Sequence, residues 1–172
     1  MFTGANHLCI VTGDIDRAVR AWADGLGVGP WSVYTYDETT MTTVVDGEPR
    51  PFAMRVALCQ LGGGFSIELI QPLDDRSPYA DSLKGHDGTD HFHHVKLDVD
   101  DFDQAAATLA SGGMGITFDG RFPGVVGEAH GRYFDTADEL GLVIEVGELS
   151  PGFAMHAPDY EYPVVSGSPA RA

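Results

Sequence analysis

An ungapped internal repeat limits what this chain can fold into more than any other feature of its sequence. The segment "HLCIVTGDIDRAVRAWADG", which begins at His7, aligns with "HVKLDVDDFDQAAATLASG", which begins at His94. At this offset of 87 positions (94 − 7) the alignment pairs acidic, small and glycine residues: Asp14 with Asp101, Asp16 with Asp103, Ala18 with Ala105, Ala23 with Ala110 and Gly25 with Gly112. Self-similarity at a fixed period predicts two copies of one supersecondary unit.

Both copies show the same order of secondary-structure signals. Each opens with an alternating apolar stretch, residues 7–12 in the first copy, which is typical of a strand. An aspartate can then cap a helix and glycine can end it; the candidates are Asp14 or Asp16 with Gly25 and Gly27, then Asp101 or Asp103 with Gly112. Strand-like runs follow at residues 31–36, 52–61 and 65–71, and again at 115–118, 131–135 and 141–149. Each module is therefore predicted to be βαβββ.

The positions of these modules divide the chain into four segments. We expect a first module (1–72), a turn-rich linker (73–91), a second module (92–150) and a C-terminal tail (151–172). The tail is rich in proline and small residues, and three of its aromatic side chains are expected to hold it against the body: Phe153, Tyr160 and Tyr162.

Composition excludes several classes of function. A net charge of −16 disfavours binding to nucleic acid, whose phosphates require a basic surface, and is equally unsuited to an anionic membrane. No stretch approaches the ~20 apolar residues of a membrane helix, and the N-terminus shows no signal-peptide pattern. Cys9 and Cys59 form no C-x-x-C motif and fit a reducing cytoplasm, where we expect the protein to be located.

Four polar residues occupy repeat-related positions. The last strands of the modules also align, "GFSIELI" with "GLVIEVG", which pairs Glu68 with Glu145 as His7 pairs with His94. Because strand side chains alternate, all four lie on the face opposite the apolar residues of their strands. A lone histidine or glutamate in a strand is usually solvated or hydrogen-bonded, but two glutamates in one cleft would repel unless neutralised. Two imidazoles and two carboxylates are a familiar shell for a divalent transition metal, which is the interpretation we favour.

The sequence resembles the vicinal oxygen chelate superfamily of glyoxalases, methylmalonyl-CoA epimerases, bleomycin-resistance proteins and extradiol dioxygenases. The resemblance covers residues 5–149 and is carried by "NHLCIVTGDIDRAVRAWADGLGVGPW", by "IELIQPL" followed by "GHDGTDHFHHVKLDVDDFDQA", and by "GLVIEVGE". The combination of "GVGPW" with "ELIQP" and "HH" looks most like the methylmalonyl-CoA epimerase-like branch. The resemblance implies an α+β fold in which two tandem βαβββ modules form a cupped, barrel-like mixed sheet with a metal inside.

The same resemblance assigns the metal ligands and their neighbours. It implies one divalent ion (Zn, Co, Ni, Mn or Fe) bound by His7, Glu68, His94 and Glu145. Family members often carry "HH" at this point with the second histidine as the ligand, so we expect His94 to bind the metal and His93, of opposite strand parity, not to bind it. Lys96 and Asp98 share the face of His94, where we expect them to form an ion pair.

The predicted activity is proton transfer next to a carbonyl in a small-molecule substrate. The metal would hold two substrate oxygens and stabilise an enediolate, while a carboxylate moves the proton. Glu145 or Glu68 could do this while loosely ligated, and Glu48 is the candidate base that is not a ligand. An epimerase, an isomerase and a glyoxalase-like lyase all fit this chemistry, and we expect a homodimer.

Two other functions remain open for the same fold. A binding protein of the bleomycin-resistance type would sequester a ligand in the cleft; a stoichiometric metal favours the enzyme, whereas a metal-free chain with a tightly bound organic ligand favours sequestration. An iron-dependent dioxygenase fits less well, because its two histidines and one carboxylate leave three positions open, and Glu68 would fill one of them.

The metal interpretation generates a first prediction. Replacing His94 with alanine removes an assigned ligand and should abolish stoichiometric metal binding. His93→Ala is the matched control, because the neighbouring side chain points to the other face of its strand. Elemental analysis of the purified variants measures both outcomes, and equal metal content in the two variants would contradict the assignment.

Overall fold

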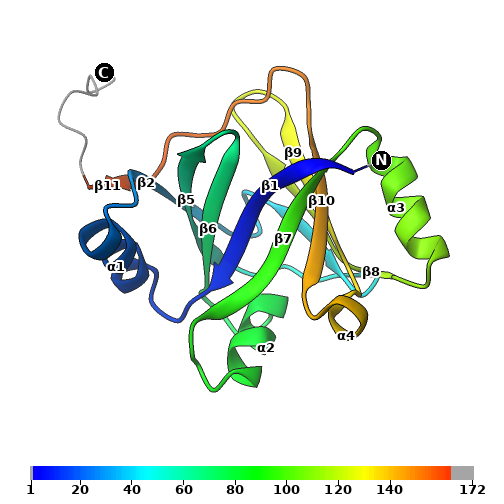
Figure 1. Cartoon of the computed structure of the whole chain (residues 1–172), viewed down its shortest axis with the longest axis horizontal. Helices are drawn as coiled ribbons and strands as arrows, with labels where there is room; N and C mark the ends of the chain where they lie inside the picture. The colour runs from blue at the N-terminus through cyan, green and yellow to red at the C-terminus, as the bar shows by residue number, and fades with distance from the viewer. Residues whose placement is uncertain (1, 164–172) are drawn as a thin grey trace.

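The computed structural model describes residues 2–163, and its first half follows the predicted order of elements with one addition, a short hairpin (Figure 1). These elements are β1 (Phe2–Val11), α1 (Ile15–Leu26), β2 (Trp31–Tyr36), β3 (Thr42–Val45), β4 (Glu48–Pro49), β5 (Met54–Gly62) and β6 (Phe65–Pro72). Of the two candidate caps of α1, Asp14 is the one used, since its side chain accepts a hydrogen bond from the Arg17 amide. Gly27 ends this helix at a φ of 68°, a left-handed conformation that glycine adopts at little steric cost.

The second half repeats the pattern. Its elements are α2 (Pro78–Gly85), β7 (His91–Val99), α3 (Phe102–Ser111), β8 (Ile116–Pro123), β9 (Glu128–Phe134), α4 (Ala137–Leu140), β10 (Val143–Leu149) and β11 (Tyr160–Tyr162). Asp101 caps α3 by accepting a hydrogen bond from the Gln104 amide. Helix α2 lies in the segment expected to be a linker; Ser77 caps it and Pro78 begins it, which is a start signal that the sequence analysis did not use.

The strands form one mixed sheet with an internal two-fold pattern. Among the described residues, the strand order is β11-β2-β5-β6-β1-β7-β10-β9-β8-β3-β4. Its central eight strands are two copies of one arrangement, β2-β5-β6-β1 from the first half and, in mirror order, β7-β10-β9-β8 from the second. The predicted α+β class, with a cupped sheet built from two repeated modules, is confirmed.

The antiparallel pair β1–β7 joins the two halves at the centre of the sheet. Cys9 on β1 lies opposite His94 on β7. Each of these strands has a parallel partner on its outer side, which places Glu68 of β6 beside Cys9 and Glu145 of β10 beside Lys96. The first and last strands of both modules therefore meet at the middle of one sheet.

The hydrophobic cores lie on both faces of this sheet. Helix α1 covers the first half with a cluster that includes Ile15, Val19, Trp31, Val33, Ile67 and Leu69. Helix α3 covers the second half with Phe102, Ala106, Phe134, Ile144 and Val146. A third cluster lines the concave face and contains Cys9, Val11, Met54, Val56, Ile70, Tyr79, Phe118 and Tyr133. The apolar strand faces opposite His7, Glu68, His94 and Glu145 thus pack against helices, as the alternation predicts.

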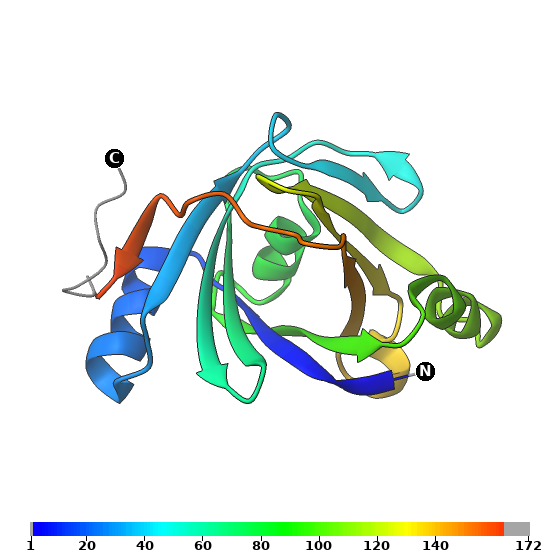
Figure 2. The ribbon, with the colours of Figure 1, turned by 90° about the horizontal axis from the view of Figure 1, so that it is seen from above.

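Two further elements enclose the concave face. The hairpin β3–β4 comes from the first half of the chain, yet β3 pairs with β8 at the far edge of the second half. Helix α2 lies at one end of the cup (Figures 1 and 2), where the buried ring of Tyr79 packs against Phe52 and Tyr133. Neither element belongs to the repeat, so the repeat alone could not reveal them.

Residues 150–159, here called the strap, cross the open side of the cup from β10 to β11 (Figure 2). Near its start, the Ala154 amide donates to the Val126 carbonyl over 3.0 Å. Near its end, the Asp159 amide donates to the Val33 carbonyl over 2.8 Å, and β11 then pairs with β2. The expected C-terminal tail is therefore structured as far as residue 163, and residues 164–172 lie outside the described part. No helix within residues 2–163 is long and apolar enough to cross a membrane.

Gly124 allows the strap to approach the β8–β9 turn closely. A Cβ atom at this position would lie 2.3 Å from the Ala154 carbonyl oxygen and 2.7 Å from Cε2 of Phe153. We predict that Gly124→Ala displaces the strap at a cost of about 1–3 kcal/mol, the usual range for overpacking. Hydrogen exchange at the Ala154 amide should accelerate, while exchange at the Asp159 amide stays unchanged.

Gly25→Ala is the matched control, because no atom lies within 4 Å of a Cβ at that helical position. Alanine favours a helix over glycine, so this variant should be as stable as the parent or slightly more stable. Equal exchange at the Ala154 amide in both variants would show that Gly124 does not control the position of the strap.

Candidate metal centre

The structure brings together the four residues assigned by the repeat. His7 lies on β1, Glu68 on β6, His94 on β7 and Glu145 on β10, the four adjacent strands at the centre of the sheet. His94 is completely buried, and His7 and Glu145 are 7% exposed. All four side chains point into the concave side of the sheet, because strand alternation turns their apolar neighbours toward the helices.

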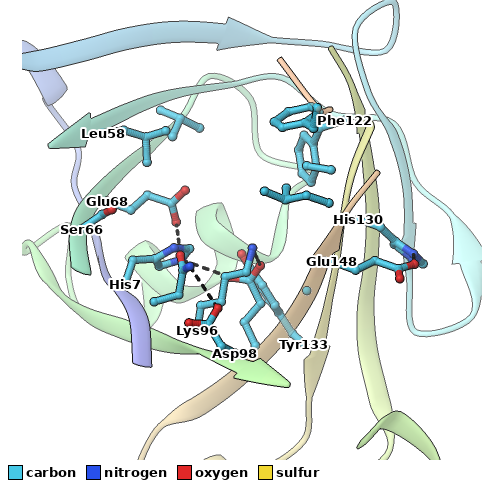
Figure 3. A pocket seen from close by; sticks show the side chains of 18 of the residues that line it. His7, Leu58, Ser66, Glu68, Lys96, Asp98, Phe122, His130, Tyr133 and Glu148 are labelled. Atoms are coloured by element: carbon cyan, nitrogen blue, oxygen red, sulfur yellow. Dashed lines mark hydrogen bonds and ion pairs between the residues drawn. The ribbon is translucent and has the colours of Figure 1, made fainter. Parts of the chain in front are cut away.

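The donor atoms of these residues lie close together, and Figure 3 shows Glu68 and His7 facing each other. The Nε2 atoms of His7 and His94 are 3.2 Å apart. Oε2 of Glu145 lies 3.2 Å from the His7 nitrogen and 3.1 Å from the His94 nitrogen. Oε2 of Glu68 lies 3.4 Å from each of the same nitrogens. Each glutamate thus places one oxygen 3.1–3.4 Å from both imidazole nitrogens.

This donor set fits a divalent transition metal. An ion about 2.1 Å from each donor would separate neighbouring donors by about 3.0–3.4 Å, depending on coordination geometry. The observed separations of 3.1–3.4 Å fall in this range. The combination of imidazole and carboxylate suits Zn, Co, Ni, Mn and Fe. His7, Glu68, His94 and Glu145 are therefore the residues that would hold the ion.

The two glutamates are charged despite their burial. Burial raises the pKa of Glu68, but the charge of His7 and the hydrogen bond and charge of His94 outweigh it, so that the pKa lies below its usual value. Burial also raises the pKa of Glu145, and here Lys96 adds to both imidazoles and holds the pKa well below its usual value. Both carboxylates are thus available as anionic donors.

His94 is the deepest of the four. Burial lowers its pKa, but interactions with Cys9 and with the two glutamates outweigh burial and raise the pKa well above its usual value. A site that favours a proton on this imidazole also favours any other cation at the same point. Proton and metal compete for it, so metal affinity should fall as pH falls.

His93 contacts the side of the His94 ring that faces away from the other three residues of the cluster. Their Nδ1 atoms are 2.9 Å apart, so the ring nitrogen of His94 that faces away from the site has a hydrogen-bond partner. Burial lowers the pKa of His93 to about 3, which keeps this ring neutral and able to accept a hydrogen bond. If Nδ1 of His94 donates to it, the Nε2 lone pair of His94 is free for a metal. Strand alternation predicted that His93 points away from the face of His94. The structure differs, because the β1–β7 register shifts next to this residue and its ring packs against Tyr79 and Tyr133, from where it contacts His94.

Lys96 makes the two halves of the site unequal. Its Nζ lies 3.5 Å from Oε1 of Glu145, so the expected ion pair with Asp98 is replaced by a pair with a site residue. Asp98 instead accepts a hydrogen bond from Nδ2 of Asn6. At the equivalent repeat position, Cys9 adjoins Glu68 and, because burial raises its thiol pKa to about 12, carries no charge.

Two glycines provide space for this ion pair. A Cβ at position 131 would lie 2.7 Å from Oε1 of Glu145, and one at position 147 would lie 2.6 Å from Cε of Lys96. The sequence pattern indicated only that Gly131 and Gly147 belong to strands. Their role follows from strand pairing, which no local pattern reveals.

Glu48, the third candidate for proton transfer, is not brought to this cluster. It lies on the short edge strand β4, where it is exposed and pairs with Val45 of β3. It is also absent from the described residues that line the cavity above the cluster. The hairpin that carries it extends along the far edge of the sheet, which the order of residues in the sequence did not indicate.

A cavity of about 580 Å³ opens above His7, Glu68 and Glu145. It lies within the usual size range of small-molecule sites. The hydroxyls of Tyr79 and Tyr133 are 2.7 Å apart at its buried end, and the Tyr133 ring lies 4.6 Å from that of His94. Burial raises the pKa of both tyrosines well above the usual value, so both remain neutral hydrogen-bonding groups.

Comparison with known proteins decides the family. The model of the glyoxalase/bleomycin resistance protein/dioxygenase superfamily matches residues 6–134, three quarters of the chain. The chain belongs to this superfamily. The predicted resemblance to the superfamily is confirmed. A search of curated protein sequences found no significant match.

Solved structures share the superfamily fold at low sequence identity. Methylmalonyl-CoA epimerase from Mycobacterium tuberculosis is 24% identical, with a TM-score of 0.62 over 87% of this chain and 90% of that chain. A variant of the Streptomyces coelicolor methylmalonyl-CoA epimerase in complex with 2-nitronate-propionyl-CoA is 18% identical, with a TM-score of 0.66 over 90% and 99%. A hypothetical protein from Bacillus halodurans is 17% identical, with a TM-score of 0.61 over 84% and 92%. These similarities establish the fold.

The support of His94 by His93 generates a prediction. His93→Ala removes the hydrogen-bond partner of the ligand, and loss of such a partner typically costs 10–100-fold in metal affinity. Zinc titration should show weaker binding that still reaches one ion per chain. Phe92→Ala is the control, because this neighbouring side chain is 46% exposed and should leave the affinity unchanged. Unchanged zinc affinity in His93→Ala would show that the Nδ1 contact does not support the ligand.

Proposed function

We propose that this protein is a divalent-metal-dependent enzyme that transfers a proton at the carbon next to a carbonyl, as an epimerase, isomerase or glyoxalase-like lyase. The convergence of His7, Glu68, His94 and Glu145 at the bottom of a ligand-sized cavity carries the proposal. When bound there, the ion supplies positive charge that stabilises the oxygen on which negative charge develops. Superfamily membership and the epimerases among its structural neighbours support the same class of reaction.

The two glutamates have different roles in the proposed reaction. Lys96 contacts Oε1 of Glu145 while Oε2 faces the imidazoles, so both oxygens of this carboxylate are engaged. A carboxylate with both oxygens held in this way is suited to remain bound to the metal as a ligand. We assign Glu145 this positioning role.

Glu68 is better placed to carry the proton. Its Oε2 lies 3.4 Å from both imidazole nitrogens, farther than the 3.1 and 3.2 Å of Glu145. Its neighbour at the position equivalent to Lys96 is the uncharged Cys9. It lines the cavity and is 14% exposed at the side chain, so substrate carbon can approach it. A carboxylate with this freedom can accept a proton from the substrate carbon and return it.

The arrangement favours this function over the two alternatives. A sequestering protein needs a cavity but gains nothing from two buried carboxylates that must be neutralised. An iron dioxygenase uses one carboxylate and two histidines, whereas here Glu68 and Glu145 both face the histidines. Oxygen consumption in the presence of iron would identify the dioxygenase. Location in the cytoplasm and assembly as a homodimer stay predictions.

Solvent hydrogen exchange tests the proposal. Zinc-, cobalt- or nickel-loaded protein is incubated in deuterated water with racemic 2-methyl-3-oxo acids, their CoA thioesters and aromatic 2-hydroxy ketones. Deuterium should enter the carbon next to the carbonyl of at least one compound. Glu68→Gln should lower this rate by about 10²–10⁴-fold, the usual contribution of a general base, with metal content unchanged. Mass spectrometry of recovered substrate and product measures the exchange.

Glu145→Gln is the matched variant, since it removes the same charge from the equivalent position of the repeat. It should weaken metal binding more than Glu68→Gln and, at saturating metal, retain more activity. The reverse order of rates would transfer the role of base to Glu145. Cleavage of a carbon–carbon bond without oxygen, and without exchange in any recovered compound, would replace proton transfer with a lyase or hydrolase reaction.

A further inference from the structure

We propose that the cavity selects an uncharged carbonyl compound that carries an aromatic or similarly flat apolar group, and that it excludes polyanionic carriers such as CoA thioesters. This inference rests on the proposed function, because it assumes that the substrate carbonyl lies at the cluster of His7, Glu68, His94 and Glu145. It names the class of substrate that the rest of the cavity admits.

The charges that line the cavity disfavour a polyanion. Besides the two site glutamates, its described lining contains Asp98, Asp100 and Glu148. Lys96 is the single lysine or arginine among these lining residues, and it is paired with Glu145. Phosphate groups in the cavity would therefore face carboxylates, and the described lining offers them no lysine or arginine other than the paired Lys96.

The other lysine and arginine residues within residues 2–163 also contact groups outside the cavity. Of the ten lysine and arginine residues, nine lie in the described part of the chain. Eight of these nine are within 4.0 Å of a carboxylate: Arg17, Arg50, Arg55, Arg76, Lys84, Lys96, Arg121 and Arg132. The ninth, Arg20, lies over the ring of Tyr162, 5.8 Å from its centre. Proteins that bind phosphates ordinarily present arginine, lysine or a helix N-terminus to them, and this cavity presents acidic groups instead.

The wall across the cavity from the cluster is apolar and largely aromatic. Phe122 lies on this side, across the cavity from His7 and Glu68 (Figure 3), whereas Leu58 lies beside Glu68 on the neighbouring strand β5. The Phe122 ring packs edge-on against Tyr36, with 5.5 Å between ring centres. Rings in such an arrangement present faces and edges that suit another flat ring.

The strap adds the remaining part of this wall. Phe153 and Met155 both line the cavity, and the strap that carries them crosses its open side (Figure 2). The strap is held at both ends, through Ala154 to the β8–β9 turn and through Asp159 to β2. The absence of a side chain at Gly124 lets Phe153 approach that turn closely. A small acyl group would not reach these side chains, whereas an aromatic substituent extending from the cluster would bury its ring beneath them.

Binding of two chelating probes tests the inference without depending on turnover. Benzohydroxamic acid and acetohydroxamic acid bind metal through the same group and differ in a phenyl ring against a methyl group. Isothermal titration of zinc-loaded protein should show benzohydroxamic acid binding at least tenfold tighter. Free coenzyme A should show no binding at about 1 mM, a concentration that would reveal interactions of about −4 kcal/mol.

Variants of the strap test whether its side chains cause the preference for benzohydroxamic acid over acetohydroxamic acid. Phe153→Ala should reduce the ratio of the two probe affinities to threefold or less, while His156→Ala, an exposed strap residue outside the cavity lining, should preserve it. If Phe153→Ala unfolds, which circular dichroism would reveal, Met155→Ala replaces it with the same expectation. Equal affinity for the two probes, micromolar binding of coenzyme A, or an unchanged ratio in the folded strap variant would each overturn the inference. Absence of deuterium exchange with every substrate would instead count against the proposed function and leave the probe ratio as measured.

Discussion

Two glutamates lie beside two imidazoles at the centre of the sheet. The arrangement of the surrounding strands and side chains depends on balancing the negative charge of these glutamates. Removing carboxylates from water is costly unless opposite charges and hydrogen bonds replace it. Here each of Glu68 and Glu145 faces both His7 and His94 at 3.1–3.4 Å. The antiparallel pairing of β1 with β7, with β6 and β10 on the outside, is what places all four within reach of one cation.

The repeat makes the two halves of the cluster nearly symmetric. The proposed roles of its two glutamates depend on a repeat position where the neighbouring residues differ in charge. Cys9 and Lys96 are equivalent by the same offset of 87 positions (96 − 9). One is a neutral thiol beside Glu68 and the other a cation beside Glu145. Two carboxylates that the repeat makes equivalent are therefore electrostatically different, which is the usual condition for one to act as a ligand and the other as a base.

Elements outside the repeat determine what can reach the cluster. The hairpin β3–β4 extends the sheet on one side, α2 fills the buried end with Tyr79, and the strap crosses the opening with Phe153 and Met155. None of these elements carries a proposed metal ligand. The strand order therefore fixes the position of the four-residue cluster, while the added elements and the acidic lining are the features that we propose select the molecule admitted to it.

The sequence by itself determined the two modules, two candidate caps for the helix of each module and the four residues of the proposed centre, because the repeat is read directly from the sequence and strand alternation fixes which face each side chain takes. Only the tertiary structure placed Lys96 on Glu145, His93 behind His94 and Glu48 at a distant edge. Those relations depend on which strands become neighbours across the sheet. Strand pairing is set by the packing of residues far apart in the chain, so the repeat could single out the four proposed ligands but not the neighbouring residues that make them unequal.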